Sequence, residues 1–400
     1  MHTHSTMNLL GLPDYYLLNM KESDTAITLF VESKTTGVTC SQCGNLATVI
    51  YDHRKPRRVG VETIRGKAVY IIVRPKRFRC TCGSVTQEVL PSIAPYAHQV
   101  DEFAQKLRDR SLRHPMSEVA SEENVPYSTM RARQAEAIDT MDYPDIDWKN
   151  IKRIGIDEFS NKKRHQYYLI ITDLDRKEAI AILPNRTKLE LKCFLAQLKE
   201  VITIEAFAID MWAAYATAVK EIFPNAKPVV DRFHVVKYAI DALCKVRREL
   251  QKTLENKDER TQVWKIRNVL CANRQDLDDE TRQELDKTLE VYPKLKAAYW
   301  LKERFRQWYE YAGTRAEEGF CKWVNQVKKL GHQAFLDVVE TIKRWKEGIF
   351  NYFLIGITNG PTKGINNKIK AIKRACYGRL SFRTLRARIL FSFRDPVRVN

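Results

Sequence analysis

Two short apolar runs that each end in an aspartate constrain the fold of this chain more than any other feature. They are Ile154-Gly-Ile-Asp157 and Ala206-Phe-Ala-Ile-Asp210. A carboxylate at the end of a buried strand is costly unless its charge is compensated, and a metal ion is the usual partner. Taken alone, each aspartate would more simply cap the following turn or helix. Two such strands in one sheet instead predict that Asp157 and Asp210 hold Mg²⁺ or Mn²⁺ together.

The segments around these aspartates alternate between strand and helix patterns. Strands are predicted at 151–159, 167–174, 178–183, 206–210 and 227–236, and helices at 188–201 and 212–223. Three strands followed by helix, strand, helix and strand is the order of a ribonuclease H-like core. Paired divalent ions activate the attacking oxygen and stabilise the leaving one in phosphodiester chemistry. The fifth strand adds Asp231 and His234, which we expect to support the site by orienting DNA or water, or to hydrogen-bond to each other.

Four of the nine cysteines form two closely spaced pairs, Cys40-Ser-Gln-Cys43 and Cys80-Thr-Cys82. Each pair can bring two sulfurs to one ion, which predicts a structural Zn²⁺ site with four thiolate ligands. The alternatives are four unrelated buried thiols, or His53 in place of one ligand. The other five cysteines are scattered through helical segments, and we interpret them as core residues.

The net charge of +19 is concentrated in two segments. Residues 53–79 hold ten Lys and Arg against one Glu, and residues 361–400 hold eleven against one Asp. This clustering predicts surfaces that bind nucleic acid, although solvated basic faces or an anionic membrane are alternatives. The residues expected to contact phosphates are Arg54, Lys55, Arg57, Arg58, Lys368, Lys370, Lys373 and Arg374.

A helix-turn-helix is predicted between these two segments. Residues 116–134 contain one helix, a turn at Asn124-Val-Pro126, and a second helix that opens near Tyr127 or Ser128. The second helix of such a motif enters the major groove, and its base readers are expected to be Arg131, Arg133 and Gln134. Ser128 at the start of this helix is also expected to bind DNA. A polar helical hairpin without DNA-binding activity would have a similar pattern.

These features predict a multidomain α+β chain. The expected parts are a zinc-binding β module (1–95), a helix-turn-helix (96–145), the first part of the ribonuclease H-like core (146–238), an all-helical insertion (239–350), and the last part of the core with a basic helix (351–400). No run approaches 18 apolar residues, and the N-terminus lacks the pattern of a signal peptide. We therefore expect a cytoplasmic protein associated with the bacterial nucleoid.

Four motifs together resemble the ISL3 family of bacterial insertion-sequence transposases. They are Ile154-Gly-Ile-Asp-Glu-Phe-Ser160, Ile209-Asp-Met-Trp212, Asp231-Arg-Phe-His-Val-Val236, and the segment that begins Thr358-Asn-Gly-Pro-Thr-Lys363 and ends at Arg374. The resemblance covers nearly the whole chain. It implies a metal-dependent DDE nuclease that cuts double-stranded DNA at terminal inverted repeats, joins the 3′ ends to a target, and acts as a dimer on paired ends.

One residue departs from the family pattern. Lys363 stands where the family has its third catalytic carboxylate, a glutamate, and no acidic residue lies between Glu347 and Asp395. A positive charge beside divalent ions predicts poor cleavage or none, with Glu347 as the fallback acid. The alternatives are a non-catalytic DNA-binding regulator derived from a transposase, or a structure-specific nuclease unrelated to transposition.

Overall fold

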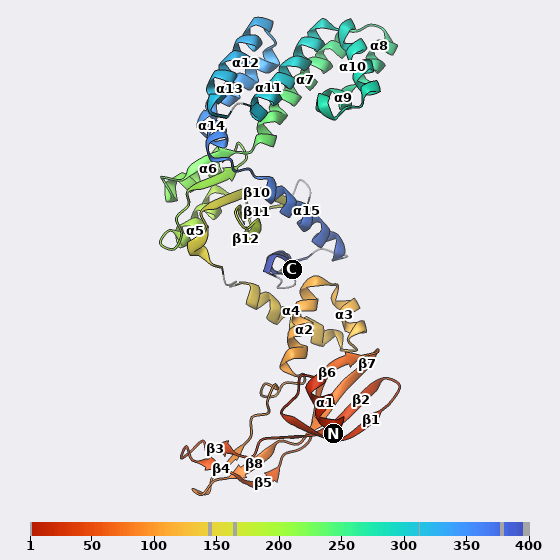
Figure 1. The fold of residues 1–400 in the computed structure, drawn as a ribbon, viewed down its shortest axis with the longest axis vertical. Coiled ribbons are helices and arrows are strands. Elements are labelled where there is room, and N and C mark those ends of the chain that lie inside the picture. Colours follow the sequence, from red (N-terminus) through yellow and green to blue (C-terminus); the bar gives the residue numbers. More distant parts are fainter. Residues whose placement is uncertain (1, 143–145, 163–165, 312, 377–379, 395–400) are drawn as a thin grey trace. The chain divides into compact units, whose positions relative to one another are not determined.

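The protein is described by a computed structural model that covers residues 2–142, 146–162, 166–311, 313–376 and 380–394. The chain divides into two units. Unit 1 comprises Met1–Pro144 and Lys370–Asn400, and unit 2 comprises Asp145–Ile369. The described residues form sixteen α-helices and several sheets, as expected for a mixed α+β chain (Figure 1).

Unit 1 begins with helix α1 (His2–Leu9) and a four-stranded sheet in the order β1-β2-β7-β6. The strands are β1 (Tyr15–Glu22), β2 (Ala26–Ser33), β6 (Arg57–Ile64) and β7 (Lys67–Val73), and β2 and β7 are parallel. The β6–β7 hairpin turns at Arg65 and Gly66, which both have positive φ, as a tight two-residue hairpin turn requires. Buried side chains such as Leu29, Val59 and Ile71 form the core of this sheet.

Short strands carry the paired cysteines. They are β3 (Val38–Thr39), β4 (Leu46–Ala47), β5 (Val49–His53), β8 (Lys76–Arg79) and β9 (Val85–Gln87). β3 pairs with β4, and β5, β8 and β9 form a second small sheet. Their only sizeable apolar cluster among the described residues is Phe78 with Ala47, Cys40 and Cys80, too small a core to hold this module by itself.

Three helices follow the sheets of unit 1: α2 (Asp101–Arg113), α3 (Met116–Glu122) and α4 (Tyr127–Asp142). A fourth helix, α16 (Phe382–Arg394), packs on α2 and α4 through Ala387, Leu112 and Ala137. Arg388 on α16 donates to the carbonyl oxygens of Ser111 and His114, both at 2.9 Å. The assignment of all of 351–400 to the ribonuclease H-like core therefore needs correction, because this apolar contact and the two buried bonds tie α16 to unit 1.

Unit 2 contains a five-stranded sheet in the order β12-β11-β10-β13-β14. Its elements are β10 (Arg153–Lys162), β11 (Gln166–Asp173), β12 (Glu178–Leu183), α5 (Lys188–Leu198), β13 (Ala206–Ile209), α6 (Ala213–Ile222) and β14 (Lys227–Val230). β10, β13 and β14 are parallel, whereas β11 is antiparallel to β10 and β12 is antiparallel to β11. The order of strands and helices is the one predicted from the sequence.

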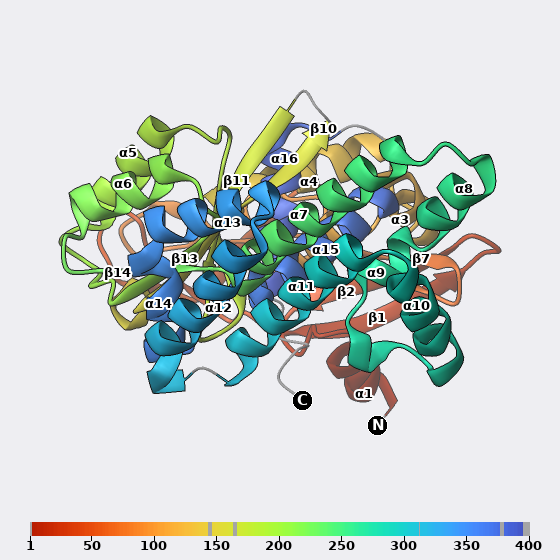
Figure 2. The same ribbon diagram turned by 90° about the horizontal axis from the view of Figure 1, so that it is seen from above.

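Helices α5 and α6 lie side by side on one face of this sheet (Figures 1 and 2). Ile154 and Ile156 of β10 and Phe207 and Ile209 of β13 point into that core. Since side chains alternate along a strand, Gly155, Asp157 and Ala208 belong to the opposite face. This face packs against helix α14 (Lys346–Ile355) and the N-terminal half of helix α15 (Gly360–Ala375).

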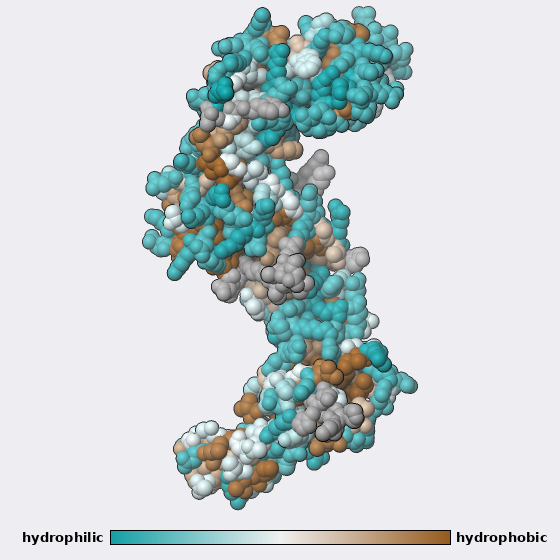
Figure 3. Space-filling model, in the orientation of Figure 1, coloured by the Kyte–Doolittle hydropathy of each residue, from teal (hydrophilic) through white to brown (hydrophobic). Residues whose placement is uncertain are grey.

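The helical insertion starts earlier than predicted. Strand β14 ends at Val230 and helix α7 (Arg232–Thr253) begins almost at once, so the strand expected over 227–236 is only four residues long. The remaining helices are α8 (Lys257–Lys265), α9 (Arg267–Cys271), α10 (Asp279–Val291), α11 (Pro293–Tyr311), α12 (Ala316–Leu330) and α13 (Gln333–Arg344). Phe305, Trp308 and Trp323 lie at the centre of their apolar core. Hydrophilic residues cover most of the visible face of these helices (Figure 3).

None of the helices within the described ranges has the length and apolar character needed to cross a membrane.

Gly155→Ala tests the packing of α15 on β10. A Cβ at Gly155 would lie 2.5 Å from Thr362 Oγ1, 2.6 Å from Asn359 Oδ1 and 2.8 Å from Leu174 Cδ2. We expect the substitution to lower the free energy of unfolding by about 1–3 kcal/mol, because buried neighbours must move. Gly364→Ala on α15 is the control, since its Cβ would meet nothing within 4 Å. Equal denaturation midpoints for the two variants would contradict this packing.

Candidate active site

Asp157 and Asp210 are brought to the same edge of the unit 2 sheet. The parallel register pairs Ile154 with Phe207 and Gly155 with Ala208. Two residues further along in each of the two strand segments, this register places Asp157 opposite Asp210, on the face away from α5 and α6. Asp157 does not end its strand, as had been predicted, because β11 pairs with β10 as far as Lys162. The pairing with β13 ends at Gly155, and this opens the edge where both carboxylates lie.

The Asp157 carboxylate is held in place from two sides. Its Oδ1 accepts from the backbone N–H of Glu158 at 2.7 Å, and its Oδ2 accepts from Asn366 Nδ2 at 2.9 Å. Burial, followed by the nearby negative charge of Asp210, raises the pKa of Asp157 from 3.8 to about 6. The two aspartates therefore concentrate negative charge that a bound cation would relieve.

Asp210 belongs to a second cluster with Asp231 and His234, whose ligand atoms all lie within 4.8 Å of one another. His234 Nε2 lies 3.0 Å from Asp210 Oδ1 and 3.9 Å from Asp231 Oδ2. Asp231 donates its N–H to the carbonyl of Ile209, the last bond to the sheet, and then precedes the first turn of α7. Because residues three apart share a helix face, His234 and Asp231 point to the same place.

Lys363 reaches this cluster from α15. Its Nζ donates to Asp231 Oδ2 at 2.5 Å and lies 3.9 Å from the centroid of the Phe233 ring. Asp231 is almost completely buried, so Lys363 supplies the counter-charge that its carboxylate requires. The residue at the position of the expected glutamate thus faces the carboxylates, with the opposite charge.

The start of α15 carries the residues that the sequence analysis missed. The helix begins at Gly360, and just before it Thr358 Oγ1 accepts from Gly360 N–H at 2.8 Å. Asn359 donates to the carbonyl of Ile156 at 3.3 Å, and Asn366 donates to Asp157. The spacing of 359, 362, 363 and 366 is that of one helix face, and this was the available signal.

The oxygen atoms of Asp157 and Asp210 fit a divalent cation of the Mg²⁺ or Mn²⁺ type. Carboxylate oxygen is the ligand that these ions prefer, and burial together with the charge of Asp210 raises the pKa of Asp157, an effect that a bound cation would oppose. Glu347, the fallback acid, does not reach this place. It is an exposed residue of α14 that pairs with Lys220 at 3.3 Å.

The four paired cysteines of unit 1 converge, with all four Sγ atoms within 4.8 Å of one another. Cys40 and Cys82 are 3.7 Å apart, and Cys43 and Cys80 are 3.4 Å apart. A tetrahedral ion with Zn–S bonds near 2.3 Å would separate its sulfurs by roughly 3.8 Å. Gly44 and Gly83, both at positive φ, make the tight turns that follow each pair. His53 is exposed and lies outside the cluster.

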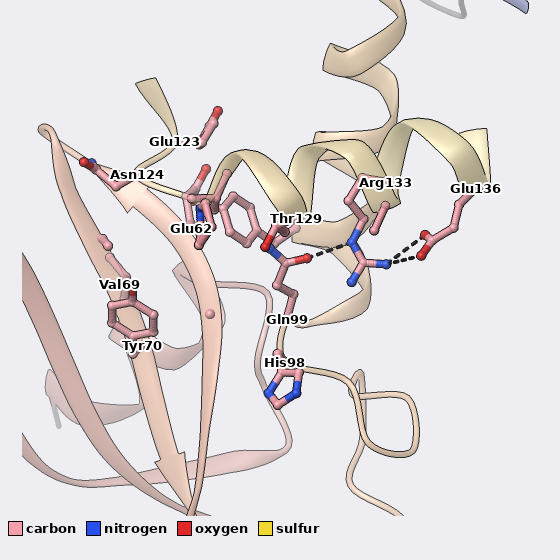
Figure 4. A pocket seen from close by; sticks show the side chains of 16 residues that line it. Glu62, Val69, Tyr70, His98, Gln99, Glu123, Asn124, Thr129, Arg133 and Glu136 are labelled. Atoms are coloured by element: carbon pink, nitrogen blue, oxygen red, sulfur yellow. Dashed lines mark hydrogen bonds and ion pairs between the residues drawn. The ribbon is translucent and has the colours of Figure 1, made fainter. Parts of the chain in front are cut away.

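Only some of the DNA-contacting residues predicted for the second helix of the helix-turn-helix, α4, are exposed. Ser128 and Arg131 are exposed on α4. Arg133 is held by Gln99 at 2.8 Å and by Glu136 at 2.8 Å, beside a cavity of about 400 Å³ under α4 (Figure 4). Gln134 is buried and donates to the Ser111 carbonyl at 3.1 Å, so its prediction as a base reader was wrong. It faces α2 because α4 needs an inner face to pack.

The predicted phosphate-binding residues lie in two places. Arg54, Lys55 and Arg57 line a cavity of about 650 Å³ in unit 1, where Arg57 also donates to the Ala97 carbonyl at 2.7 Å. The guanidinium of Arg58 stacks on Tyr70 at 3.7 Å. On α15 the four basic residues are exposed or half-buried: Lys368, Lys370, Lys373 and Arg374.

Comparison with known proteins gives a consistent result. The family model of the ISL3-type DDE proteins, described as Transposase, matches residues 154–389. The transposase for insertion sequence element IS1001 of Bordetella parapertussis is 27% identical over 358 residues, which is 88% of each chain. The transposase for insertion sequence element IS1557 of Mycobacterium tuberculosis is 25% identical over 256 residues, or 57% of each chain.

Asp157→Asn tests the buried charge at the sheet edge. Because folding raises the pKa of Asp157, its ionised form destabilises the fold, an effect absent below pH 3.8 and complete above about pH 6. In EDTA at pH 8 the amide should therefore raise the free energy of unfolding, by roughly 3 kcal/mol at most, and change it little at pH 4. Asp279→Asn, at a side chain 89% exposed, is the control. An equal change in the free energy of unfolding at pH 4 and pH 8 would contradict a raised pKa of Asp157.

Cys43→Ser tests the thiolate cluster. The purified chain should contain about one zinc ion per molecule by elemental analysis, and the variant should lose most of it, because three thiolates hold the ion less tightly. The exposed Cys193 of α5 provides the matched control, and Cys193→Ser should keep the full zinc content. Zinc-free wild-type protein, or an unchanged content in the Cys43 variant, would refute the site.

Proposed function

The chain belongs to the ISL3 family of transposases, and from this we propose that it binds the terminal inverted repeats of an insertion sequence, with its DNA-cleaving activity impaired by Lys363. The observation that carries the proposal is the meeting of Asp157, Asp210, Asp231 and His234 with the ammonium group of Lys363. The partner is double-stranded DNA, in the form of transposon ends and target, in the bacterial cytoplasm.

The proposed reaction centre is the carboxylate pair. Asn366 donates to Asp157, and His234 Nε2 lies 3.0 Å from Asp210 Oδ1, and we propose that both carboxylates present oxygen atoms to the same cation. When bound, Mg²⁺ or Mn²⁺ would activate the attacking oxygen and neutralise the leaving one. Burial of Asp157 makes each charge interaction there stronger than it would be in water.

Lys363 acts against this reaction through its charge. Two unit charges about 4 Å apart interact by roughly 4 kcal/mol at an effective dielectric constant near 20, and a divalent cation would feel more. The same ammonium neutralises buried Asp231, so the fold keeps its stability while cation binding is weakened. We therefore propose a protein that retains its structure and DNA binding but cuts DNA slowly or not at all.

DNA binding is assigned to both ends of the chain. The proposed parts are the zinc module (1–95), the helix-turn-helix (96–145), the nuclease core (146–231 and 351–400, without α16) and the helical insertion (232–350). Ser128 and Arg131 are the exposed candidates for base contacts on α4, and the basic side chains of α15 suit phosphate contacts. A dimer on paired ends is expected from the family.

A second candidate function is that of a non-catalytic regulator derived from a transposase. The ion pair between Lys363 and Asp231 favours it, because a residue integrated into the charge balance of the buried cluster is a stable feature of the fold. In this case the protein would occupy the inverted repeats without cutting them.

Lys363→Glu separates the two functions. Duplexes with the ends of the element that encodes the chain are incubated with Mg²⁺, and nicking is followed on denaturing gels. The wild-type chain should be almost inactive and the variant at least about 100-fold faster, in line with the charge effect above. Asp157→Ala combined with Lys363→Glu is the control, and it should lose the gained activity.

Robust and equal nicking by the wild type and the Lys363→Glu variant would contradict the role of Lys363. Tight end binding without nicking by either protein would favour the regulator. Circular dichroism of each variant shows whether the fold is intact, so loss of structure is not mistaken for loss of activity.

A further inference from the structure

A cavity of about 430 Å³ opens beside the carboxylate cluster within unit 2. Its volume lies in the range of small-molecule sites. One wall comes from the first turn of α7, one from α15, and the rest from the helical insertion. The lining residues that matter here are Arg232, Phe233, Asn273, Gln275, Arg306 and Lys363. Asp231 belongs both to this cavity and to the cluster, so a molecule in the cavity would adjoin the proposed reaction centre.

Phe233 is the unusual member of this lining. It is 60% exposed, although it stands between the buried Asp231 and the half-buried His234 at the start of α7. Its ring meets the His234 ring edge-on at 5.5 Å, and the Lys363 ammonium lies over it at 3.9 Å. An exposed aromatic ring beside a cation is an arrangement on which unpaired nucleobases stack while the cation contacts phosphate.

Arg306 supplies an independent indication of a ligand. It is only 5% exposed, and its Nη1 has no hydrogen-bond acceptor among the described residues. Nη1 lies 3.8 Å from Glu303 Oε2, which is an ion pair too long for a hydrogen bond, and Nη2 donates to Glu310 at 3.3 Å. A buried guanidinium N–H without an acceptor is costly, and a ligand that accepts a hydrogen bond would remove that cost. Ring nitrogens and carbonyl oxygens of nucleobases are such acceptors.

From these observations we infer that the cavity binds one unpaired nucleotide at the end of the DNA. Its base stacks on Phe233, its edge faces the amides of Asn273 and Gln275 and the guanidinium of Arg306, and its phosphate lies near Lys363 and Arg232. The inference rests on the proposed function, since it assumes that DNA ends reach the carboxylate cluster. It adds that one nucleotide of the end leaves the duplex and is held by the insertion.

The test compares two duplexes that differ only at one end, bound to the full chain in EDTA. One is blunt, and the other has a three-nucleotide 3′ overhang that contains 2-aminopurine. The overhang duplex should bind about tenfold more tightly, which is the effect of stacking one base. Stacking on Phe233 should also quench the fluorescence of 2-aminopurine in the wild-type complex. Phe233→Ala should abolish the difference in affinity and restore the fluorescence, whereas Phe233→Trp should preserve both the preference for the overhang and the quenching.

Trp264→Ala is the matched control, because Trp264 is an exposed aromatic of the insertion that does not line the cavity. It should keep the preference for the overhang. Equal affinity of the wild type for the two duplexes, or a preference that survives Phe233→Ala, would overturn the inference while leaving end binding intact. Displacement of the overhang by free dAMP at micromolar concentration would assign the cavity to a free nucleotide and also overturn it. No binding of either duplex would overturn the proposed function and the inference together.

Discussion

The close approach of helix α15 to strand β10 at Gly155 is the contact on which the rest of the site depends. A glycine is needed there because Thr362 and Asn359 occupy the space of a side chain. This contact joins segments about 200 residues apart and lets Asn366 reach Asp157. Without it the first carboxylate would lose its orienting partner, and the helix that carries position 363 would have no defined place beside the sheet.

Charge balance determines what the assembled site can do. Asp210, Asp231 and His234 converge where the sheet ends, close enough to Asp157 for the charge of Asp210 to raise its pKa, and the only cation that α15 is seen to bring to them, within the described part of the chain, is Lys363. A lysine ammonium can neutralise one carboxylate but cannot polarise a phosphodiester as a divalent ion does. Lys363 therefore balances the charge of Asp231, and the chemistry of the site depends on whether a divalent cation can bind beside this ammonium group.

The sequence predicted the sheet of unit 2 well, because apolar runs ending in Asp157 and Asp210 are local patterns. The predicted end of the fifth strand was wrong, because β-branched residues continue on both sides of Asp231. In the structure the N–H of Asp231 makes the last bond to the sheet, and α7 begins at the next residue. The roles of Asn366 and Gln134 depend on which helix face packs inward, and a single polar residue in a helix does not reveal this. Both contacts arise from tertiary packing, and only Asn366 had a local signal, its spacing from residues 359, 362 and 363 on one helix face.

The central claim is that the ammonium group of Lys363 weakens cation binding by the carboxylates. Calorimetric titration of Mn²⁺ into the wild-type chain and into Lys363→Met tests it directly, because methionine removes the charge without adding a ligand. The variant should bind Mn²⁺ at least about tenfold more tightly, and the added affinity should disappear when Asp157 is also replaced by alanine. Equal affinities for Mn²⁺ in the wild type and the methionine variant would contradict the account.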